Sequence, residues 1–110
     1  MPLLTITELE KATPLFRGKC GNAFCRGLMR MLCIDKVNDL YDRNAFIKGP
    51  DFAGAILKDI GVQYEVLNPE VLKALPDGPF ITISNHPYGS IDGIILADYF
   101  GHLCPGYKIM

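Results

Sequence analysis

Residues 80–93 read Phe80-Ile81-Thr82-Ile83-Ser84-Asn85-His86-Pro87-Tyr88-Gly89-Ser90-Ile91-Asp92-Gly93. The stretch opens with an apolar, β-branched run of the kind that favours an extended strand. The run stops at Asn-His, and an aspartate follows six residues after the histidine. The apolar spacing from Gly89 to Phe100 then predicts a helix. We therefore expect a buried strand that leads into a helix through a loop carrying His86.

Two further segments, taken together with the predicted strand and helix, indicate the fold class. Val62 to Val66 alternates apolar and polar residues, and Tyr107 to Met110 has the composition of a strand that is beginning. Strand, crossover helix and strand in succession are typical of a parallel sheet with helices on its faces. We therefore expect an α/β fold: a helical N-terminal region, residues 1–61, followed by residues 62–110 as the start of a mostly parallel sheet with flanking helices. Since the chain ends on a predicted strand, the domain is expected to be incomplete.

The first half of the chain predicts helices. Thr7 and Glu10 have the spacing of a capping box, and Asp35 is a candidate N-cap for a later helix. Gly61 is expected to end the predicted helix at 51–60, at its C′ position. The predicted helices cover residues 5–13, 22–32, 35–41, 51–60 and, as a short one opened by a proline, 69–75.

Composition narrows the class of protein. The chain has 110 residues, enough for one domain and too few for two. Its 49% hydrophobic and 21% charged residues are ordinary for a globular protein and argue against disorder. The formal net charge of -1 argues against a nucleic-acid partner, which would favour a basic excess. No signal peptide opens the chain, and no apolar run approaches the roughly 20 residues that span a bilayer.

The cysteines lack the paired close spacing of a zinc site, so no metal site is expected. They fit reduced thiols in a cytoplasmic protein. The predicted helix at 22–32 leaves two interpretations open. Its Arg26 and Arg30, beside Phe24 and Met31, suit either peripheral contact with an anionic membrane at its inner face or a solvated face of a packed helix. The four cysteines are Cys20, Cys25, Cys33 and Cys104.

His86 and Asp92 form the candidate catalytic pair. A neutral imidazole can take a proton from an attacking group near physiological pH, and a carboxylate that orients the ring improves this role. Asp92 is the nearest acid along the chain. Ser90 lies near His86 but lacks the Gly-x-Ser-x-Gly elbow of a serine nucleophile, which favours direct transfer over a covalent intermediate. The alternative is structural: His86 and Asp92 would then only cap the backbone.

The stretch Gly78-Pro79-Phe80-Ile81-Thr82-Ile83-Ser84-Asn85-His86-Pro87, with Gly89 and Asp92-Gly93, resembles the first motif of the glycerolipid and lysophospholipid acyltransferases. It is most similar to the bacterial hemolysin-like and ornithine-lipid acyltransferase branch. The general family motif is shorter between the histidine and the aspartate. Here five residues separate them, a spacing that this branch shares. The similarity covers 16 residues, 78–93.

The resemblance implies a function for these residues. His86 would be the general base, with Asp92 as the group that orients it. The acyl donor would be a thioester of coenzyme A or acyl carrier protein, with no bound cofactor. The acceptor would be a lysolipid hydroxyl or the amine of an amino-acid lipid precursor. Residues that would contact the substrate are Asn85, Tyr88, Gly89 and Ser90.

Two motifs of such enzymes do not occur in this sequence: an arginine-bearing phosphate-binding segment and a Pro-Glu-Gly segment. The resemblance therefore predicts the N-terminal piece of a longer acyltransferase, with little transfer activity by itself. The rival hypothesis is a non-catalytic α/β interaction module.

The other titratable residues that could belong to a functional site have simpler interpretations. His102 lies at the end of a predicted helix, where a cationic ring complements the helix dipole. Asp51, Asp59 and Glu65 are expected to be solvated surface charges.

Overall fold

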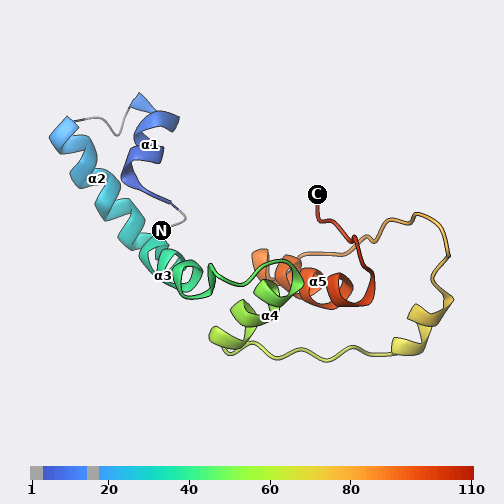
Figure 1. Cartoon of the computed structure of the whole chain (residues 1–110). Helices are drawn as coiled ribbons and strands as arrows, with labels where there is room; N and C mark the ends of the chain where they lie inside the picture. The colour runs from blue at the N-terminus through green and yellow to red at the C-terminus, as the bar shows by residue number, and fades with distance from the viewer. Residues whose placement is uncertain (1–3, 15–17) are drawn as a thin grey trace. The chain divides into compact units, whose positions relative to one another are not determined.

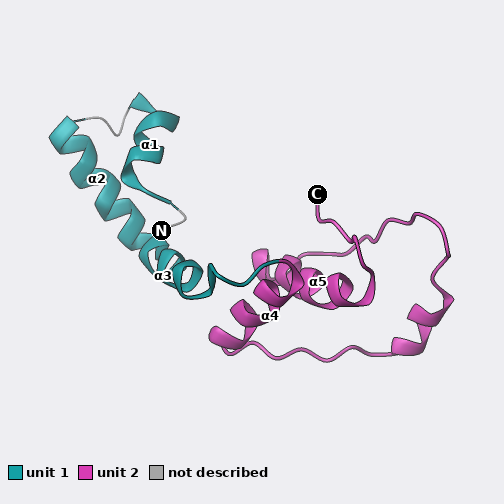
Figure 2. Cartoon of the chain, viewed as in Figure 1, with its two compact units in different colours: residues 1–48 teal, residues 49–110 magenta. Residues whose placement is uncertain are grey.

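A computed structural model describes residues 4–14 and 18–110 (Figure 1). The chain divides into two compact units, residues 1–48 and 49–110 (Figure 2). The elements are α1 (Ile6–Ala12), α2 (Gly18–Met31), α3 (Ile34–Asn44), α4 (Pro50–Asp59), the 3-10 helix η2 (Pro69–Ala74) and α5 (Ser90–Leu103).

The start of α1 is set by a capping box two residues earlier than predicted. The Thr5 hydroxyl accepts the N–H of Glu8 at 3.4 Å, and the Glu8 carboxylate accepts the N–H of Thr5 at 2.8 Å. The N-cap predicted at Thr7 is therefore wrong. The sequence offers two overlapping Thr-x-x-Glu boxes, and the earlier one adds Ile6 and Thr7 to the helix.

The other helices of the first unit follow the apolar periodicity. In α2, Cys25 and Met29 are buried one helical turn apart. The predicted N-cap Asp35 is wrong, since α3 begins after Cys33, which adopts a left-handed φ of 56°. The side chain of Asn38 in α3 makes two 2.8 Å hydrogen bonds, with the N–H and the carbonyl of Leu4. Leu4, two residues before α1, is thereby fastened to α3.

The second unit is built on the packing of α4 against α5. The apolar face of α4 supplies its buried residues, Ala53, Ile56 and Leu57, and Leu57 is only 3% exposed. Gly61 follows the helix with φ +72° and confirms its predicted role as the residue that ends α4.

Two glycines let these helices approach closely. A Cβ at Gly101 of α5 would lie 2.6 Å from the Pro50 ring of α4. A Cβ at Gly54 of α4 would lie 2.8 Å from the Asp98 carboxylate of α5. Both distances are shorter than van der Waals contact. The small residues therefore set the helix separation at two neighbouring points of the contact.

The predicted α/β fold is wrong. None of residues 4–14 and 18–110 belongs to a β-strand, and Val62–Val66, Phe80–Ser84 and Tyr107–Met110 run as irregular segments (Figure 1). β-Branched residues favour an extended backbone, but a sheet also needs a neighbouring strand that supplies ladder hydrogen bonds. The contact that joins two of these segments is made by side chains: the hydroxyls of Thr82 and Tyr107 lie 2.8 Å apart.

Helix α5 is the most apolar element, and Ile91 to Phe100 are all half-buried. It has 14 residues, whereas crossing a bilayer takes roughly 20. Across the described ranges, no helix combines the length and apolar character that a membrane span requires.

Candidate functional site

His86 and Asp92 lie on either side of the turn that opens α5. Residues 87–89 form this turn, which the Gly89 N–H closes by donating to the His86 carbonyl at 3.3 Å. Gly89 has φ +68°, a conformation that favours glycine because it has no Cβ. The structure thus places His86 just before α5 and Asp92 in the first turn of the helix.

The Asp92 carboxylate binds the loop backbone and not the histidine. Its Oδ2 accepts the N–H of Tyr88 at 2.8 Å. In the described part of the chain, His86 and Asp92 share no hydrogen bond or ion pair. Asp92 therefore fixes the turn that carries His86, and the direct contact expected from the sequence is not formed here.

The His86 ring is exposed and lines a groove of about 690 Å³ within the second unit. The groove walls come from residues 78–86, one face of α5 and residues 104–110. Tyr107 supports one wall by stacking on Phe100, with ring centroids 5.3 Å apart. The lining is mostly apolar and includes Phe80, Ile81 and Leu96. A nitrogen base thus opens onto an apolar groove.

Three of the four predicted substrate contacts lie in the loop before α5, and the fourth, Ser90, is the first residue of that helix. Asn85, Tyr88, Gly89 and Ser90 are exposed, but the groove is lined by Ser84, His86 and Gly93 of the same stretch. The Ser84 hydroxyl donates to the Asn85 carbonyl at 2.8 Å. The structure therefore brings one predicted site residue, His86, to the groove.

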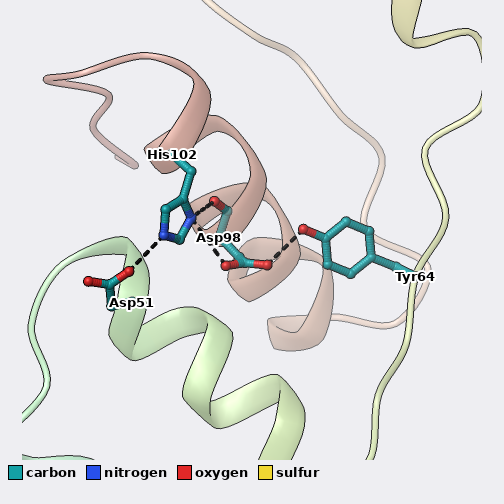
Figure 3. A network of polar contacts seen from close by, with 4 residues as sticks. All are labelled: Asp51, Tyr64, Asp98 and His102. Carbon is teal, nitrogen blue, oxygen red and sulfur yellow. Dashed lines mark hydrogen bonds and ion pairs between the residues drawn. The ribbon is translucent and has the colours of Figure 1, made fainter.

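A second histidine holds a polar network that the sequence analysis missed (Figure 3). Nε2 of His102 lies 2.8 Å from Oδ1 of Asp51, and Nδ1 lies 2.6 Å from the carbonyl oxygen of Asp98. The Asp98 carboxylate is 3.3 Å from the same Nδ1 and accepts the Tyr64 hydroxyl at 2.7 Å. Asp98 and His102 are one turn apart in α5, a spacing visible in the sequence. Asp51 is brought in only by the packing of α4 on α5.

The two histidines have opposite surroundings. Both ring nitrogens of His102 face oxygen acceptors, and the bond to Asp51, followed by that to the Asp98 carbonyl, raises the pKa of His102 above 6.5. No ring nitrogen of His102 is left for a substrate. Within residues 4–14 and 18–110, the His86 side chain has no hydrogen-bond or ion-pair partner. His86 is therefore the histidine that can exchange a proton with a bound molecule.

Tyr64 is tied to the same network. Burial, reinforced by the hydrogen bond to Asp98, raises the pKa of Tyr64 to about 12. Together with Tyr99, it lines a small hollow of about 300 Å³. Tyr64 and Tyr99 contact edge to face with centroids 6.4 Å apart.

An alkaline titration should show the raised pKa of Tyr64. Tyr64 is expected to ionise near pH 12, because burial and the hydrogen bond that its hydroxyl donates to Asp98 both raise its pKa. The raised pKa makes the stabilising effect of Tyr64 complete below its ordinary pKa of 10, and lost as pH rises towards 12. Ultraviolet difference absorbance of wild type and Tyr64→Phe measures it. If the variant loses a phase near pH 10 instead, the assignment is wrong.

No three His, Cys, Asp or Glu side chains converge in the described part of the chain as a metal ion would require. Comparisons with protein-family models, curated proteins and solved structures yield no match for this chain. The resemblance carried by residues 78–93 therefore stays a prediction, and the functional argument rests on the chain's own residues.

Proposed function

We propose that this chain supplies the catalytic base of an acyltransferase that moves a fatty acyl group from a thioester to a lipid acceptor. The observation that carries the proposal is the position of His86, which opens onto an apolar groove with neither ring nitrogen engaged by the residues that the structure describes. A general base needs such a free nitrogen. An apolar groove of about 690 Å³ provides a suitable surface for an acyl chain.

The proposed reaction balances without a bound cofactor. A nitrogen of His86 takes the proton from an acceptor hydroxyl or amine as that oxygen or nitrogen attacks the thioester carbonyl. The tetrahedral intermediate then breaks its carbon–sulfur bond, and the thiolate takes the proton from the imidazolium. The products are an ester or amide and a free thiol. Coenzyme A and acyl carrier protein are the two proposed thioester carriers.

Asp92 has a positioning role in this proposal. Its carboxylate holds the Tyr88 N–H, so it fixes the turn between His86 and the start of α5. Asp92 thereby orients the base through the loop backbone. The positive end of the α5 dipole also favours an ionised carboxylate at this position.

A second candidate function is a non-catalytic interaction module. The observation that favours it is the contact of Asp92 with the loop backbone and not with His86. In that case His86 would be dispensable for any chemistry. A transfer assay separates the candidates: the native protein that contains these residues is given acyl-coenzyme A or acyl carrier protein thioester with a lysolipid, and products are read by mass spectrometry. Absence of acyl transfer with every donor and acceptor pair would favour the module.

Peripheral membrane contact is part of the proposal, and α2 is the element proposed to make it. Phe24 and Met31 on this helix are 58% and 72% exposed, and Arg26 and Arg30 are exposed beside them. No acidic residue occurs in α2. A basic helix that exposes apolar side chains suits the interface of an anionic bilayer.

We expect the chain to float with anionic liposomes and to stay in solution with neutral ones. The charge-reversing double variant Arg26→Glu/Arg30→Glu should lose the binding, because the arginines would no longer attract the lipid head groups. Density-gradient flotation measures the bound fraction. A matched reversal outside α2, Lys58→Glu, should leave it unchanged. Equal flotation with both liposome types, or none with either, would exclude this contact.

A further inference from the structure

His102 joins three segments of the second unit. It lies in the last turn of α5, contacts Asp51 in the first turn of α4, and shares Asp98 with Tyr64 of the segment after α4 (Figure 3). Asp51, Tyr64 and the Asp98–His102 pair are separated in the sequence, and none belongs to the His86 site. The network therefore has a role separate from the proposed acyl transfer.

The contacts specify the charge state of His102. A neutral imidazole carries one N–H and one lone pair. Here Nε2 faces a carboxylate oxygen and Nδ1 faces a carbonyl oxygen, and neither oxygen can donate a hydrogen bond back. The doubly protonated ring satisfies both contacts, whereas the neutral ring must turn a lone pair towards an oxygen. The geometry alone thus selects the imidazolium.

The dipoles of the two helices also favour the imidazolium form of His102. The last turn of α5 is the negative end of its dipole and favours a cation at His102. The first turn of α4 is the positive end and favours an anion at Asp51. The titratable groups that face the ring are Asp51 from α4 and Asp98 from α5, with Tyr64 reached through Asp98. Both carboxylates favour the cationic ring.

We propose that charged His102 is a pH-dependent clamp that holds the N-terminus of α4 against the C-terminus of α5. Close helix packing at the same place supports the proposal, because Gly101, next to His102, contacts Pro50, next to Asp51. Loss of the proton removes the ion pair and one hydrogen bond at this end of the helix pair.

The direction of the pH effect follows from linkage. The pKa of His102 is raised in the folded chain. A raised pKa means that the folded state binds the proton more tightly than the unfolded state. The added stability is complete below the ordinary pKa of 6.5 and is lost as pH rises through the raised value. The clamp is therefore in place below pH 6.5 and weakens as pH rises through the raised pKa of His102.

The chain has two histidines, so a single substitution assigns the imidazole signals that test the clamp. Imidazole NMR signals of the 110-residue chain are followed against pH, and His102→Gln assigns the signals. We expect His102 to titrate above its ordinary pKa of 6.5 in the wild type. Asp51→Asn should lower the midpoint of His102 because it replaces the negative carboxylate beside Nε2 by a neutral amide. Asp77→Asn, at an exposed bend, is the matched control and should leave that midpoint unchanged.

Thermal unfolding gives the second readout. The wild type should lose melting temperature as pH rises through the His102 midpoint, and His102→Gln should lack that step while His86→Gln keeps it. Circular dichroism establishes that each variant is folded at the start. An unchanged His102 midpoint in Asp51→Asn, or parallel melting curves for wild type and His102→Gln, would overturn the clamp. Neither outcome bears on acyl transfer by His86.

Discussion

Replacing His86 by alanine should lower the rate of acyl transfer by about 10²- to 10⁴-fold, the usual loss when a general base is removed. The ring is the proton acceptor at the groove, and the alanine methyl group cannot replace it. The groove itself is expected to persist, because many other residues line it, among them Phe80, Leu96 and Tyr107. The loss should therefore fall mainly on kcat. Initial rates of the native protein containing these residues, measured against thioester and acceptor concentration, give both constants.

His102→Gln is the matched control for this experiment. It removes the chain's other imidazole, whose nitrogens are both engaged by Asp51 and Asp98. At a temperature well below unfolding, the control should keep the wild-type rate. An active His86→Ala variant would exclude His86 as the base and leave the interaction module as the better explanation. Equal losses in both variants would point to general damage to the second unit.

Replacing Gly101 by alanine should destabilise the second unit by about 1–3 kcal/mol, the usual range for overpacking. The new Cβ would lie 2.6 Å from Cγ and 2.9 Å from Cβ of Pro50. The proline ring has little freedom to turn away, so the helices must separate. This cost opposes the helix-propensity gain of about 1 kcal/mol that alanine normally brings. Urea unfolding, followed by circular dichroism, measures the net change.

Gly93→Ala is the matched variant in the same helix. A Cβ at Gly93 would have no atom within 4 Å, so only the propensity gain remains. We expect Gly93→Ala to stabilise α5 by up to about 1 kcal/mol. Opposite signs at Gly101 and Gly93 would establish the close α4–α5 contact. A stabilising Gly101→Ala would show that the helices are further apart than described here.

Helices were the part of the fold that local sequence patterns predicted well. The apolar spacing in residues 22–32 and 89–100, and the terminating Gly61, located α2, α5 and the end of α4. These signals act between residues within a turn or two of each other, so the sequence shows them directly. Boundaries were less certain, since Thr5 and Thr7 compete for the same capping role.

Strands were predicted wrongly for a physical reason. The β-branched run at Phe80 to Ser84 records a preference for extended backbone, but strand formation depends on a partner elsewhere in the chain. In the described residues this run makes side-chain contact with Tyr107 and no backbone ladder. Intrinsic preference alone therefore could not establish a sheet.

The candidate site likewise has features that the local sequence predicts and features that only the tertiary structure decides. The order of residues determined that His86 and Asp92 flank the start of a helix, because a strand-like run, a glycine turn and an apolar helix succeed one another locally. Only the tertiary structure decided that Asp92 binds the Tyr88 backbone and that His86 opens onto a groove. It also paired His102 with Asp51, 51 residues away, through the packing of α4 on α5. Local periodicity sets helices and turns, whereas contacts between distant side chains depend on how those helices pack.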